Sequence, residues 1–144
     1  MQTYQQILVA VDFNQSIAKV IERAQLIAGN GNSKLSLIHV VEPAPVDFLD
    51  QTMLVDMNLD RLLFKTASQQ MQKLATNHQI DSSDCYLEAG SVKSEIFSKI
   101  EMLDADLLVV GSHGRHGFGL LLGSTANSVL HGASCDVLAV RVNE

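Results

Sequence analysis

Short apolar runs alternate with segments of helical periodicity along the whole chain, and this alternation most constrains the fold. Such runs, with few polar interruptions, are typical of strands that are buried on both faces of a parallel sheet. The runs are Ile7–Val11, Leu35–Val41, Cys85–Ala89, Leu107–Val110 and Val137–Val142. Apolar residues recur at helical spacing in the segments between them. Those segments are 17–28, 59–74, 92–103 and 124–131.

Alternating strands and helices predict an α/β fold in which right-handed crossovers place helices on both faces of a parallel sheet. We expect one domain over residues 1–144, with a five-stranded sheet in the order 3-2-1-4-5, as in flavodoxin-like and Rossmann-like folds. Ligands of such sheets bind at the carboxyl ends of the strands, where the strand order reverses. The polar turn at Asp12 follows the first strand and a glycine-rich loop follows the fourth, so both are expected at that point.

The segment from Val46 to Asp60 has a poor pattern and is acidic, and it is expected to be a loop or a partly helical excursion. Its aspartates are Asp47, Asp50, Asp56 and Asp60. They lack the glycine and the ligand periodicity of a calcium loop, which favours a solvated acidic segment over a Mg²⁺ or Ca²⁺ site.

Composition excludes several classes of protein. Ten basic against sixteen acidic side chains give a formal net charge of -6, which argues against binding nucleic acid or an anionic membrane surface. The apolar runs are too short to span a bilayer. The first residues carry neither a basic nor a long apolar region, so we expect a cytoplasmic protein. Cys85 and Cys135 lie far apart, which favours two reduced thiols over a disulfide.

The loop from Gly111 to Thr125 has the features of an anion-binding turn. Glycines allow close approach of the backbone, and the first amides of the following helix have no partners within the helix. The loop is not a Walker A sequence, since no Gly-Lys-Ser/Thr follows, and it does not lie after the first strand as the dinucleotide fingerprint does. Val110 occupies the place of the first glycine of a nucleophile elbow, which makes Ser112 a poor candidate for a hydrolase nucleophile. An ordinary glycine-rich connection remains the alternative.

Histidines near this loop raise the question of a metal site. His113, His116 and His131 have no acidic or thiol ligand at a characteristic spacing, so no metal is expected. His39 lies within an apolar strand and is interpreted as a hydrogen-bonded core histidine.

The chain resembles the universal stress proteins of the UspA family over its whole length. The similarity is carried by residues 7–12, 37–40, 106–114, 123–124 and 135–140. The resemblance implies an α/β sandwich that is usually dimeric, with a nucleotide-binding branch marked by Gly-x2-Gly-x9-Gly-Ser/Thr. In this chain eight residues, Arg115 to Leu122, separate Gly114 from Gly123.

The resemblance also implies positions for a bound nucleotide, which would be ATP or AMP. Asp12 and Val40 would border the adenosine. The phosphates would be wrapped by Gly111, His113, Gly114, Gly123, Ser124 and Thr125.

We therefore expect a cytoplasmic, non-enzymatic module for survival of DNA-damaging or oxidative stress. A homodimer through the edge strand Val137–Val142 would cover an exposed apolar edge. One alternative is a slow ATPase or self-phosphorylating protein, although the chain lacks a P-loop lysine and an evident general base. The other is a structural dimer that has lost its nucleotide.

Overall fold

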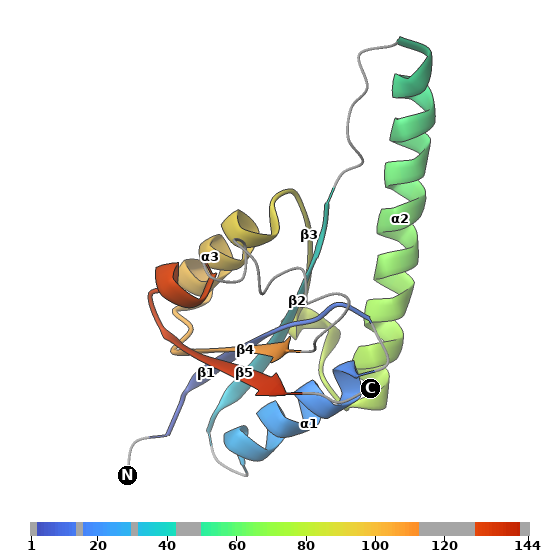
Figure 1. Cartoon of the computed structure of the whole chain (residues 1–144). Helices are drawn as coiled ribbons and strands as arrows, with labels where there is room; N and C mark the ends of the chain where they lie inside the picture. Colours follow the sequence, from blue (N-terminus) through green and yellow to red (C-terminus); the bar gives the residue numbers. More distant parts are fainter. Residues whose placement is uncertain (1–2, 14–15, 30–31, 43–49, 113–128, 142–144) are drawn as a thin grey trace.

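Five parallel strands form the sheet at the centre of the protein (Figure 1). The computed structural model describes residues 3–13, 16–29, 32–42, 50–112 and 129–141. The strands are β1 (Gln6–Ala10), β2 (Lys34–Val41), β3 (Cys85–Ala89), β4 (Leu107–Ser112) and β5 (Asp136–Arg141). Their order is β3-β2-β1-β4-β5, and all four pairings are parallel. The predicted order is confirmed, including its reversal between β1 and β4.

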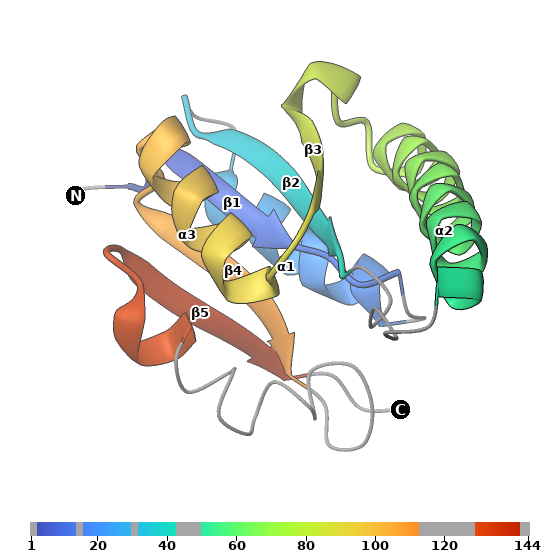
Figure 2. The same cartoon turned by 90° about the horizontal axis from the view of Figure 1, so that it is seen from above.

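Helices cover both faces of the sheet, as predicted (Figure 2). The helices are α1 (Ile17–Ala28), α2 (Asp50–Asn77) and α3 (Val92–Leu103), and a 3-10 turn, η1 (Ser82–Asp84), precedes β3. One apolar cluster joins α1 and α2 to the sheet through residues such as Ile21 and Met71. A second cluster joins α3 to the opposite face through Ile96 and Ile100. The strands read as unbroken apolar runs because they contribute side chains to both clusters.

Of the two predictions for residues 46–60, the helical one holds from Asp50 onward, because α2 begins there and continues without a break to Asn77. This helix runs beyond the end of the sheet, as Figure 1 shows in green. Its second half has a buried apolar stripe, at Ala67, Met71 and Ala75. In the sequence of the first half, apolar residues do not recur clearly at helical spacing, which is why periodicity alone did not indicate a helix there.

Several of the predicted helix boundaries are confirmed. Gly29 ends α1 with a φ of 64°, a left-handed backbone that glycine adopts without strain. Ser91 caps α3 by accepting a hydrogen bond from the Ser94 amide. Residues 129–132 are helical, and the rest of the helix predicted from Ser124 lies outside the described residues.

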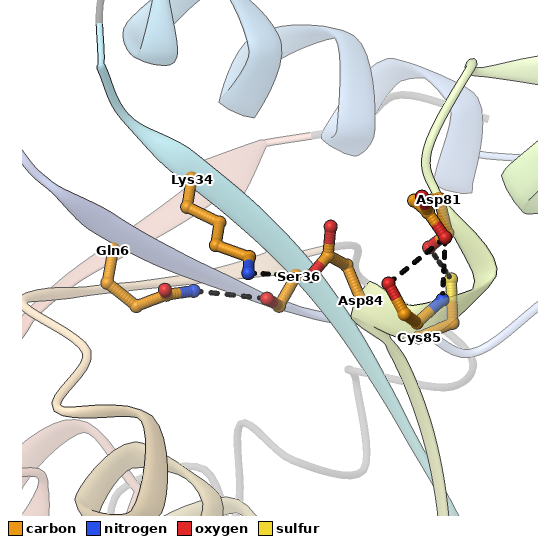
Figure 3. A network of polar contacts seen from close by, with 7 residues as sticks. Gln6, Lys34, Ser36, Asp81, Asp84 and Cys85 are labelled. Carbon is orange, nitrogen blue, oxygen red and sulfur yellow. Dashed lines mark hydrogen bonds and ion pairs between the residues drawn. The ribbon is translucent and has the colours of Figure 1, made fainter.

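Polar contacts fix the amino ends of the strands (Figure 3). Gln6 donates to the Ser36 hydroxyl at 3.0 Å, and Lys34 pairs with Asp84 at 3.2 Å. Cys85 donates to the Asp81 carbonyl at 3.6 Å, and burial raises the pKa of its thiol. Both cysteines are free thiols. These contacts hold β1, β2 and β3 in register at the edge of the sheet opposite to the carboxyl ends.

No helix in the described ranges has both the length and the apolar character that a membrane crossing requires.

Candidate functional site

The strand register brings residues from three distant parts of the chain to one level at the carboxyl ends of the strands. Val9 is level with Leu37 of β2 and with Val109 of β4. Two residues further on, Val11 is therefore level with His39 and Gly111. Asp12, Val40 and Ser112 are the next residues along these three segments of the chain. The strand order reverses here, which is where open α/β sheets bind ligands.

Asp12 is a half-buried carboxylate in the turn where the chain leaves β1. The Val11 amide just before it donates to the Ile38 carbonyl at 2.8 Å, which extends the contact between the two strands past the end of β1. A carboxylate at this place can accept hydrogen bonds from ligand hydroxyl groups. The turn at Asp12 thus lies at the carboxyl end of β1.

Val40 is half-buried and packs against the cluster beneath α3. Its partner in β3 is Glu88. Asp12 and Val40 therefore belong to the carboxyl ends of two neighbouring strands, β1 and β2.

Gly111 is buried and level with Val140 in β5. Ser112 is the last residue of β4, and its register partner is the exposed Arg141. The other predicted phosphate contacts lie outside the described residues; they are His113, Gly114, Gly123, Ser124 and Thr125. The described part of the loop therefore provides a buried glycine at the strand end.

Two aromatic side chains complete the turn at Asp12, and sequence reasoning assigned neither of them to the site. The Phe13 ring lies 4.3 Å from the His39 imidazole, between centroids, at an interplanar angle of 42°. Phe13 has a φ of 43°, which is uncommon for a bulky residue. No sequence pattern indicates a positive φ at a phenylalanine, so this feature could not have been predicted.

His39 makes a short hydrogen bond at the site. Its Nδ1 lies 2.6 Å from the Val11 carbonyl oxygen. Since a carbonyl oxygen only accepts, Nδ1 carries the proton. Burial lowers the pKa of His39, while the Val11 carbonyl and the Asp12 carboxylate act in the opposite direction. The expectation of a hydrogen-bonded core histidine is confirmed, and its partner belongs to the candidate site.

Among the described residues, no group of three or more His, Cys, Asp or Glu side chains could hold a metal ion. His113 and His116 are not among those residues. The described chemistry of the site is thus a carboxylate, a neutral imidazole, an aromatic ring and a strand-end glycine.

Known proteins share this fold over the whole chain. A universal stress protein UspA from Lactobacillus plantarum superposes with a TM-score of 0.80 at 23% identity, covering 98% of this chain and 100% of that one. A universal stress protein solved in complex with cAMP matches at a TM-score of 0.58 and 25% identity, covering 96% and 98% of the two chains.

Proteins that are related in sequence belong to the same group as these structural neighbours. Universal stress protein A homolog 1 of Coxiella burnetii is 37% identical over 142 residues, which cover 98% of this chain and 99% of that protein. Homolog 2 of the same organism is 38% identical over 143 residues, covering 99% and 98%. The model of the universal stress protein family matches residues 3–141. The chain belongs to the universal stress protein family.

Proposed function

We propose that this protein binds an adenine nucleotide, ATP or AMP, at the carboxyl ends of β1, β2 and β4. The observation that carries the proposal is the reversal of strand order where β1, β2 and β4 end, with Asp12 just after β1 and Ser112 at the end of β4. Asp12 would accept hydrogen bonds from the ribose hydroxyls, and Val40 would pack beside the base. The related structure in complex with cAMP supports an adenine nucleotide as the ligand.

The loop that follows β4 would hold the phosphates. Gly114, Gly123 and Ser124 are the residues assigned to this contact, and backbone amides of a glycine-rich loop before a helix suit an anion. Eight residues separate Gly114 from Gly123, whereas the family pattern has nine. The test therefore compares ATP with AMP, to show how many phosphates the loop holds.

At the cellular level, the protein acts as a cytoplasmic, non-enzymatic module that supports survival of DNA-damaging or oxidative stress. Nucleotide occupancy would then be a signal rather than a step of catalysis. The module would work as a homodimer, with β5 of each copy at the contact.

The test combines extraction and titration. Purified protein is denatured and the released small molecules are separated on a nucleotide-resolving column, while thermal unfolding is followed with increasing ATP-Mg²⁺ and AMP. We expect a saturable rise in Tm, since a ligand that binds only the folded state stabilises it. Asp12→Asn and Gly114→Val should each abolish the rise.

Asp104→Asn is the matched control for Asp12→Asn. Asp104 is an exposed carboxylate with a left-handed backbone at the end of α3, and asparagine tolerates that conformation. It should keep the full response to nucleotide. Absence of both co-purified nucleotide and any Tm shift would instead favour a structural dimer. Time-dependent phosphate on Ser124 or Thr125, detected by mass spectrometry, would favour self-phosphorylation.

A further inference from the structure

The turn around Asp12 has a backbone conformation that needs support from outside the turn. Phe13 has a φ of 43°, and a non-glycine residue in that region is strained by about 1 kcal/mol or more. Such a conformation persists only where surrounding contacts determine it. His39 makes two of the described contacts that support it.

His39 contacts the residues on both sides of Asp12. On one side its Nδ1–H donates to the Val11 carbonyl at 2.6 Å. On the other side its ring lies 4.3 Å from the Phe13 ring. A single imidazole therefore fixes both ends of a three-residue turn whose middle residue is the candidate ribose ligand.

His39 lies in an interior strand of the sheet. Its strand β2 has β1 on one side and β3 on the other, and Ile38 before it is buried. Phe13, whose ring contacts that of His39, packs against the cluster beneath α1 and α2. The turn is thus held between an interior strand and the core.

We propose that His39 is a positioning residue that holds the Val11–Phe13 turn, and with it Asp12, in the shape that receives the ribose of the nucleotide. The proposal rests on the proposed nucleotide site for the identity of the ligand. It assigns His39 no contact with the ligand: the donor on Nδ1 is used by the backbone, and the ring face is used by Phe13.

Two substitutions separate the two contacts of His39. His39→Asn keeps a donor near the Nδ1 position but removes the ring. His39→Phe keeps a ring against Phe13 but removes the donor. Should His39→Phe fold poorly, His39→Gln serves in its place, because its longer amide cannot occupy the Nδ1 position.

Affinity for AMP and ATP-Mg²⁺ is measured by calorimetry for each variant. We expect His39→Phe to weaken binding about tenfold, the equivalent of one lost hydrogen bond. His39→Asn should recover most of that loss. His78→Phe is the matched control, since His78 is a half-buried histidine at the end of α2, and it should bind as the unaltered protein does.

A second measurement needs no ligand. The carboxyl carbon of Asp12 and the backbone amide of Phe13 are followed by NMR in the nucleotide-free protein. His39→Phe should shift both resonances. His39→Asn should also move the Phe13 amide, because it removes the ring against Phe13, but should leave the Asp12 carboxyl carbon nearer its original position. These shifts report the turn itself, so they decide the role of His39 even where the unaltered protein binds no nucleotide and the proposed function fails.

Two results would overturn the positioning role. One is unchanged nucleotide affinity in His39→Phe. The other is a pair of unmoved resonances at Asp12 and Phe13 in that variant.

Discussion

At the scale of single residues, His39 makes folding stability depend on pH. Burial lowers its pKa in the folded protein below the ordinary value near 6.5. As the pH falls below that ordinary value, the unfolded chain takes up a proton that the folded protein does not. The free energy of unfolding should therefore fall as the solution is acidified through this range.

The prediction is tested with urea unfolding at several pH values between 7.5 and 5, for the unaltered protein and for His39→Asn. The unaltered protein should lose more stability over this range than His39→Asn, which has no group to protonate at that position. Equal slopes in the two proteins would show that His39 titrates alike in the folded and unfolded states.

At the scale of secondary-structure elements, a buried ion pair joins α3 to β3. Lys99 of α3 lies 2.6 Å from Glu88 of β3, and its ammonium lies 4.3 Å from the centre of the Tyr86 ring. The Lys99 side chain is 9% exposed and that of Glu88 is 33% exposed. Water therefore reaches the Glu88 carboxylate better than it reaches the Lys99 ammonium.

This difference predicts an asymmetry between two substitutions. Glu88→Gln leaves a buried ammonium without its counter-charge and should cost about 2 kcal/mol, below the usual cost of a fully buried pair because Glu88 is partly solvated. Lys99→Met keeps the apolar stem and leaves a carboxylate that water reaches, so it should cost less than about 1 kcal/mol. Urea unfolding of both variants measures the difference, and a larger loss in Lys99→Met would contradict the argument.

Elements packed along their length on the sheet could be predicted from sequence, and elements that extend past it could not. The strand Cys85–Ala89 has the bounds that were predicted, and its residues Cys85 and Tyr86 pack against the clusters on opposite faces of the sheet. The first turns of α2 have a poor apolar pattern in the sequence. Their aspartates therefore suggested a loop, although the chain is helical from Asp50.

At the scale of the whole molecule, the strand order and the position of the site could be predicted because they depend on topology. Right-handed crossovers and the reversal between β1 and β4 place Asp12 and Gly111 at one edge. The positive φ of Phe13 and the bond from His39 to Val11 depend instead on how two strand ends meet in three dimensions. No local pattern in the sequence indicates such a contact.

The last strand in the sheet leads to a prediction about assembly. Among the strands that the structure describes, β5 pairs with β4 alone, and its position at the edge confirms the prediction from sequence. Leu138 is half-buried and Ala139 is exposed, so the strand offers an apolar edge with backbone groups available for pairing. Antiparallel pairing of β5 with β5 of a second copy would join two sheets around a two-fold axis.

A lysine on this strand should prevent that pairing. In Ala139→Lys, two like charges would approach each other near the axis, which disfavours the cross-strand contact. Light scattering after size-exclusion chromatography should give a dimer mass for the unaltered protein and a monomer mass for the variant. Leu26→Lys, on an exposed position of α1, is the control for an added surface charge and should stay dimeric. A monomer mass for the unaltered protein would contradict the proposed dimer. A dimer mass for Ala139→Lys would show that the dimer contact does not involve β5.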